Sequence, residues 1–97
     1  MSLTATQIRE LKKLAHPLKP VVIVGQHGLS EGVMAEIDST LDTHELIKVK
    51  LAGADKAERE TLSGKIVERL SASLVQLIGR VAILYRPNPK KKKRIVV

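Results

Sequence analysis

One stretch of the chain combines three structural signals in succession: Pro20-Val21-Val22-Ile23-Val24-Gly25-Gln26-His27-Gly28-Leu29-Ser30-Glu31-Gly32. The β-branched run of residues 21–24 predicts a short strand that is buried on both faces. The G-x-x-G sequence from Gly25 to Gly28 predicts a tight turn, because glycine adopts backbone angles that other residues resist. Ser30 is well suited to cap a following helix. The stretch therefore predicts a strand, a turn at its carboxyl end, and the start of a helix.

Helix signals flank this stretch on both sides. Upstream, Thr4 and Gln7 have the spacing of a capping box and predict a first helix that Pro17 stops. Its expected apolar stripe is Ile8, Leu11, Leu14 and Ala15. Downstream, the helix capped by Ser30 is expected to bury Val33, Met34, Ile37 and Leu41.

The second half of the chain predicts one more helix and three more strands. Residues 45–51 alternate, so that Ile47, Val49 and Leu51 face one way while Lys48 and Lys50 face the other. Asp55 and Glu58 predict a third helix that runs to about Leu70, with Leu62, Ile66, Val67 and Leu70 as its buried side. Gly64 within this helix suggests close packing. Residues 74–78 and 81–85 flank Gly79-Arg80, which predicts a two-residue hairpin.

The resulting order is α-β-α-β-α-β-β. Helices after the first and second strands predict parallel pairing at both places, with right-handed connections, and the closing hairpin adds antiparallel pairing. We therefore expect an α/β fold: a compact sandwich with a mixed four-stranded sheet.

Composition limits the class of protein. A chain of 97 residues predicts one small domain, here residues 1–88, followed by a basic tail at residues 89–97. Without cysteine it forms no disulfide or thiolate metal site. No signal-peptide or membrane-spanning run is present, so we expect a soluble cytoplasmic protein without a membrane partner. The formal charge is +7, and the tail supplies five of the positive charges: Lys90, Lys91, Lys92, Lys93 and Arg94.

The charge predicts a polyanionic partner. Tyr85 is the only aromatic residue, so base stacking on aromatic platforms is excluded as a main mode of binding. A nucleic acid would have to be held through its backbone and shape. Basic residues from three elements are expected to surround the glycine turn: Lys12, Lys13, Lys19, Lys48 and Lys50.

The glycine turn itself permits two interpretations. Taken alone, G-x-x-G more often connects two elements. At the end of a strand it also brings backbone amides close to a phosphodiester chain, as in KH modules. Glu31 repels phosphate, so contact would come from backbone amides and from Gln26 and His27 between the glycines of the turn.

Enzymatic interpretations are weaker. Residues 28–32 match G-x-S-x-G, the nucleophile elbow of hydrolases, but Ser30 is better placed as a helix cap, and no acid and histidine lie at suitable distances along the chain. His16, His27 and His44 are widely separated, which argues against a metal site. No phosphate-binding G-x-x-x-x-G-K-S/T motif occurs, and we expect no cofactor and no small-molecule substrate.

The lysine run has several possible roles. It is typical of a nonspecific nucleic-acid arm with steep salt dependence, of a solubilising tail, or of a nuclear-import signal. A nonspecific binder driven mainly by this tail is therefore the alternative to a site at the glycine turn.

Residues 14–33, LAHPLKPVVIVGQHGLSEGV, followed by residues 45–50, ELIKVK, resemble the bacterial YhbY family of free-standing CRM domains. The resemblance covers about residues 3–86. It implies an RNA-binding module associated with precursors of the large (50S) ribosomal subunit. We expect this module to act on ribosomal RNA as a non-catalytic monomer. The resemblance also implies a fold similar to the C-terminal domain of a bacterial translation initiation factor. The implied RNA-contacting surface is the loop from Gly25 to Gly28 with the basic residues around it.

Overall fold

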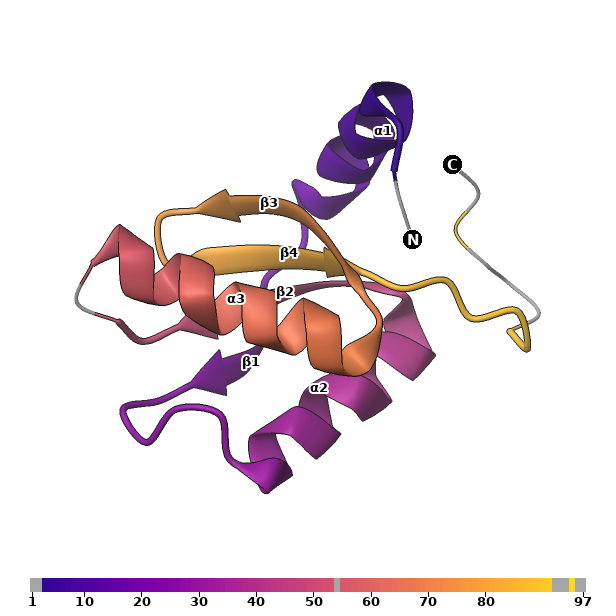
Figure 1. Cartoon of the computed structure of the whole chain (residues 1–97). Helices are drawn as coiled ribbons and strands as arrows, with labels where there is room; N and C mark the ends of the chain where they lie inside the picture. The colour runs from indigo at the N-terminus through magenta and orange to yellow at the C-terminus, as the bar shows by residue number, and fades with distance from the viewer. Residues whose placement is uncertain (1–2, 54, 92–94, 96–97) are drawn as a thin grey trace.

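A computed structural model describes residues 3–53, 55–91 and 95 of the chain. The elements follow the predicted order (Figure 1). They are α1 (Ala5–Ala15), β1 (Pro20–Val24), α2 (Glu31–His44), β2 (Leu46–Leu51), α3 (Lys56–Leu70), β3 (Ser73–Ile78) and β4 (Val81–Tyr85).

The four strands form one mixed sheet in the order β1-β2-β4-β3. β1 and β2 pair in parallel across the α2 connection, as predicted, and the β3–β4 hairpin is antiparallel. The predicted parallel pairing after the second strand is wrong in one respect. β2 and β3 run in the same direction, but β4 lies between them and is antiparallel to both. The sequence signal was correct for strand direction and incorrect for adjacency.

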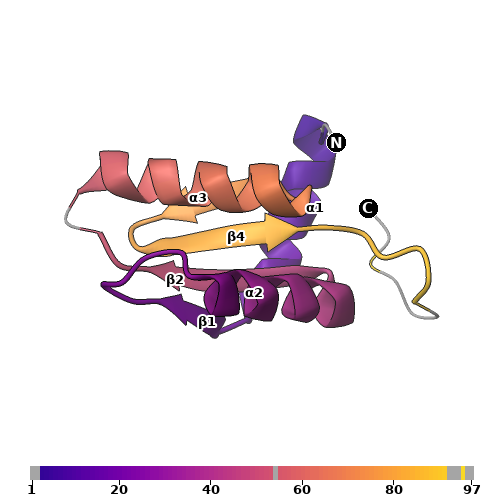
Figure 2. The ribbon, with the colours of Figure 1, turned by 60° about the horizontal axis from the view of Figure 1, so that its bottom comes forward.

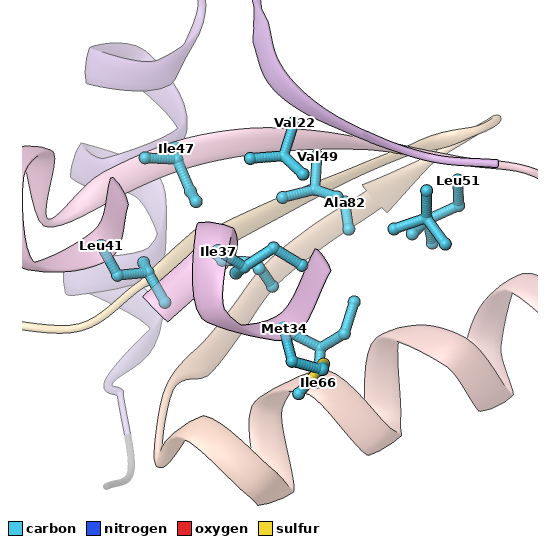
Figure 3. Close-up of a cluster of buried hydrophobic side chains, with 11 residues drawn as sticks. Val22, Met34, Ile37, Leu41, Ile47, Val49, Leu51, Ile66 and Ala82 are labelled. Carbon is cyan, nitrogen blue, oxygen red and sulfur yellow. The ribbon is translucent and has the colours of Figure 1, made fainter. Parts of the chain in front are cut away.

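Two apolar clusters cover opposite faces of the sheet. The larger joins α2 and α3 to one face and includes Met34, Ile37 and Ile66 (Figure 3). The smaller joins α1 to the other face, where Leu11 and Ala15 pack against residues at one end of the strands: Leu46, Val75, Ile83 and Tyr85. Figure 2 shows α2 and α3 on one side of the sheet and α1 behind it. Leu14, predicted in the buried stripe of α1, is 46% exposed because this helix rests on only one end of the sheet.

The predicted helix starts are confirmed. Thr4 and Gln7 form a complete capping box, and the Ser30 hydroxyl accepts a hydrogen bond from the Val33 amide. The Asp55 carboxylate accepts one from the Glu58 amide. The close packing expected at Gly64 is wrong, because a Cβ atom added there would meet nothing within 4 Å.

The prediction that the first strand is buried on both faces is also wrong. Val22 and Val24 are buried against α2, but Val21 is 50% exposed and Ile23 is 67% exposed. β1 is an edge strand, and α1 crosses the opposite end of the sheet. A β-branched run shows that a strand is present, but it does not show how many layers cover it.

Buried polar groups tie the end of the chain to α2 and β2. Glu45 is fully buried with φ +63°, and its carboxylate accepts hydrogen bonds from the amides of Asn88 (2.6 Å) and Ile95 (2.9 Å). Arg86 donates to Asp38, Asp42 and the carbonyl of Leu70, so it links α2 to the end of α3.

Candidate nucleic-acid interface

The G-x-x-G loop lies at the carboxyl end of β1, as predicted. The Gly28 amide donates to the Gly25 carbonyl at 3.0 Å and closes a turn that leaves Gln26 and His27 exposed. Gly28 has φ +74°, which explains glycine there by backbone conformation. Gly25 has no positive φ, and a Cβ atom at either glycine would meet nothing within 4 Å. The fold therefore does not need glycine at position 25, and the space beside it is open.

Two other segments lie at the same end of the sheet as the loop. The Ala52 amide donates to the Val24 carbonyl at 2.9 Å, and the Leu51 amide donates to the Arg80 carbonyl at 2.6 Å. Because β1, β2 and β3 run in the same direction, their carboxyl ends lie at the same end of the sheet. The Gly79-Arg80 hairpin tip lies at this end too. Sequence reasoning identified the hairpin but did not assign Arg80 to the site. The parallel direction of β2 and β3 was the signal that places it there.

Two clefts flank the loop on the α3 side. One, of about 810 Å³, lies between the loop, the Ala52-Gly53 segment and the start of α3, and its charged lining residues are Asp55, Glu58 and Arg80. The other, of about 640 Å³, lies between the start of α2 and α3, with Lys65, Glu68 and Arg69 among its lining residues. Neither cleft is uniformly basic, so neither has the electrostatics expected of a phosphate channel.

Glu31 is compensated locally. Both of its carboxylate oxygens accept hydrogen bonds from Arg69 Nη2 at 2.7 Å. The pair joins the first turn of α2 to the last turn of α3. The repulsion that Glu31 would exert on a phosphate is reduced accordingly, and Arg69 is engaged in the same contact.

The predicted lysines do not surround the loop. Lys50 is near it, because it pairs with Ile23 one residue before the end of β1. Lys48 lies further along β2, and its ammonium donates to the carbonyls of His16 and Leu18. Lys19 precedes β1 at the end opposite the loop, and Lys12 and Lys13 are exposed in the last turn of α1, which packs at that same end. The expected convergence is thus met only by Lys50.

Part of the basic tail contacts the body of the protein. The Lys91 ammonium donates to the carbonyl of Thr43 at 2.6 Å, and the Lys90 amide donates to the Asn88 side chain. Ile95 packs against the α1 cluster. Lys92, Lys93 and Arg94, which the sequence assigns to the nonspecific arm, lie outside the described residues.

Other kinds of site receive little support from the geometry. The Ser30 hydroxyl is engaged as the helix cap, as the sequence indicated. Among residues 3–53, 55–91 and 95, no three His, Asp or Glu side chains are grouped so that they would hold a metal ion. No helix within those ranges has the length and apolar content needed to cross a membrane.

Comparisons with known proteins match this architecture. The chain is 46% identical over 95 residues to a protein of Pseudomonas aeruginosa named a probable RNA-binding protein, covering 98% of this chain and 91% of that one. It is 48% identical over 91 residues to a Haemophilus influenzae protein named an RNA-binding protein, covering 94% and 92%. The solution structure of a hypothetical Staphylococcus aureus protein superposes with a TM-score of 0.82 at 35% identity, over 95% of each chain. The sequence model of the protein family described as CRS1 / YhbY (CRM) domain matches residues 3–86, and the chain belongs to this family.

Proposed function

We propose that this protein binds RNA without catalysing a reaction, and that it acts as a cytoplasmic monomer on ribosomal RNA in precursors of the large ribosomal subunit. RNA binding is supported by the names of its relatives in Pseudomonas and Haemophilus. The observation that carries the proposal is the loop from Gly25 to Gly28, which is open at a position where internal packing does not require glycine. The proposed role in assembly of the large ribosomal subunit is supported by the resemblance to the YhbY family.

In this proposal the RNA is contacted by the loop backbone and by the polar side chains at the loop tip. Gln26 and His27 are exposed at the loop tip and offer hydrogen bonds to phosphate, 2′-hydroxyl or base edges. Lys50 supplies positive charge next to the loop, and Lys12, Lys13, Lys19 and Lys48 extend it along the molecule. The described part of the chain exposes no aromatic side chain, because Tyr85 is only 4% exposed, so folded RNA is favoured over a stacked single strand.

A double substitution in the loop tests the proposal. Gln26→Glu combined with His27→Glu places two negative charges where phosphate would lie and should abolish specific binding in a filter titration with a large-subunit rRNA fragment. The matched control is Ala35→Glu with Ser39→Glu, which adds the same charge on the exposed face of α2. Equal affinities for the loop variant, the control and the unaltered protein would exclude the loop as the site.

Sedimentation tests the ribosomal part. The protein in a cell lysate should migrate with large-subunit precursors, and the loop variant should move to the free-protein fraction. If the unaltered protein were found only in the free-protein fraction, a role in subunit assembly would be contradicted. The filter titration would still test RNA binding separately.

The alternative is a nonspecific nucleic-acid binder driven by the tail. It is favoured by one observation: residues 90–94 carry five of the seven net positive charges. This alternative predicts loss of binding when the tail is neutralised, whereas the loop proposal predicts that specific binding persists.

A further inference from the structure

In the described part of the chain, no helix packs on the loop end of one sheet face. α1 covers the end of the sheet where Leu46 and Tyr85 lie, as Figure 2 shows behind the strands. At the other end, next to the G-x-x-G loop, one row of side chains crosses all four strands in register on the α1 side. The row consists of Ile23, Lys50, Val81 and Ile78.

This row is accessible to solvent. Ile23 is 67% exposed and Ile78 is 54% exposed, Lys50 is exposed, and Val81 is partly buried. Ile23 and Ile78 lie at opposite edges of this face, with Lys50 and Val81 between them, so exposed apolar side chains flank an ammonium group. We call the four residues the open row.

The two sides of the sheet differ in charge. α2 carries four acidic residues and neither lysine nor arginine, and α3 carries three acidic residues against four basic ones. On the other side, α1 has three basic residues and one acidic one, and β2 adds Lys48 and Lys50. A polyanion that contacts the loop is therefore drawn toward the α1 side of the sheet.

The clefts on the α3 side have mixed charge, so they attract a polyanion less than a uniformly basic surface would. Asp55 and Glu58 line the larger cleft, and Arg69 beside the smaller one is bonded to Glu31. Arg59 donates to the carbonyl of Gly53. These two clefts are thus less suited to RNA than the open row.

The chemistry of the open row indicates which form of nucleic acid it fits. It has no aromatic ring on which an unpaired base could stack. A row of apolar side chains that includes one ammonium group is suited to the wide, shallow minor groove of A-form RNA, where ribose edges and 2′-hydroxyls are accessible next to phosphates. Association of two copies through this face would bring the two Lys50 ammonium groups together, which disfavours it.

We propose that helical RNA lies across the open row, with its minor groove against Ile23 and Ile78 and with Lys50 donating to phosphate or to a 2′-hydroxyl. This inference rests on the proposed RNA-binding function and assigns the path that the RNA follows from the loop. The RNA runs over the α1 side of the sheet and not through the clefts beside α3.

Charge reversal on each side of the sheet tests the path. The probe is a fluorescently labelled 20-base-pair RNA duplex, titrated by anisotropy at several salt concentrations. Lys50→Glu should weaken binding by at least about tenfold and lower the slope of log affinity against log salt by about one. The matched control is Lys65→Glu, which makes the same change at an exposed position of α3 and should alter affinity by less than about twofold. Circular dichroism confirms that both variants are folded.

The apolar contact is tested separately. Ile23→Thr and Ile78→Thr keep β-branched side chains at exposed strand positions, so the fold is retained. Together these substitutions should weaken binding to the RNA duplex several-fold. A DNA duplex of the same sequence should bind to the unaltered protein more weakly than the RNA duplex does, because the minor groove of DNA is narrow.

Each opposite result has a distinct meaning. A loss of affinity with Lys65→Glu but not with Lys50→Glu would overturn the inference and place RNA in the α3 clefts. The loop proposal would remain intact if the Gln26/His27 variant also failed to bind. Unchanged duplex affinity with lost ribosomal co-sedimentation for Lys50→Glu would overturn it in favour of a protein partner on this face. Full binding by all of these variants, including the loop variant, would contradict the proposed function itself.

Discussion

At the scale of single residues, the two glycines of the loop differ in what requires them. Gly28 is held at φ +74°, where an L-residue is strained, whereas Gly25 has neither a positive φ nor a neighbour that a Cβ atom would meet. The sequence presents them as a symmetric motif, and only the backbone angles separate them. The fold therefore requires glycine at position 28, and nothing in its backbone angles or packing requires it at position 25.

This difference predicts opposite effects of the same substitution. Gly28→Ala should lower the free energy of unfolding by about 1–2 kcal/mol, because alanine must adopt the left-handed conformation. Gly25→Ala should leave stability unchanged or raise it by up to about 1 kcal/mol by restricting the unfolded chain, yet weaken RNA binding. Urea unfolding and filter binding measure the two effects. Unimpaired RNA binding by a stable Gly25→Ala protein would show that RNA does not approach the loop backbone there.

At the scale of elements, sequence patterns located each helix and strand but not how the layers cover the sheet. The capping signals at Thr4, Ser30 and Asp55 were reliable because they depend on residues three apart in the chain. The exposure of Ile23 and the separation of β2 from β3 depend on where α1 and β4 pack, which no local pattern encodes. The same limit applies to the candidate site. The loop could be predicted from its motif, but the placement of Arg80 beside it and of Lys12 away from it depends on the topology.

The ion pairs that connect one element to another differ in how exposed their arginine side chains are. Arg86 is 17% exposed and bonds to Asp38, Asp42 and the Leu70 carbonyl, whereas the side chain of Arg69 is 52% exposed in its pair with Glu31. Arg86→Ala should lower the free energy of unfolding by about 2–3 kcal/mol, since it leaves partly buried acceptors without their donor. Arg69→Ala should cost about 0–1 kcal/mol. Denaturant titrations of both variants measure the difference, and equal losses would contradict the assigned structural role of Arg86.

At the scale of the whole molecule, the C-terminal segment combines charge with a structural contact. Ile95 packs against the α1 cluster, and its amide bonds to buried Glu45, so the segment that carries the lysines also contributes to folding. A variant truncated after Asn88 loses both contributions at once. Its loss of binding would not distinguish a tail that grips RNA from a domain that has been destabilised.

Neutralisation without truncation separates the two contributions. Changing residues 90–94 to glutamine removes the positive charges and retains Ile95. It costs the exposed hydrogen bond from Lys91 to the Thr43 carbonyl, so thermal stability should stay close to that of the unaltered protein. Truncation after Asn88 should lower the free energy of unfolding by about 1–3 kcal/mol, because Glu45 loses a buried hydrogen bond. The neutralised protein should still bind a large-subunit rRNA fragment in preference to an unrelated RNA, with a shallower salt dependence, because each lost phosphate contact lowers the slope by about one. If preference and salt dependence both vanished in this folded protein, the tail would be the binding element and the G-x-x-G loop a connector. Retained preference would assign recognition to the loop and the sheet, with the lysines adding affinity that is independent of sequence.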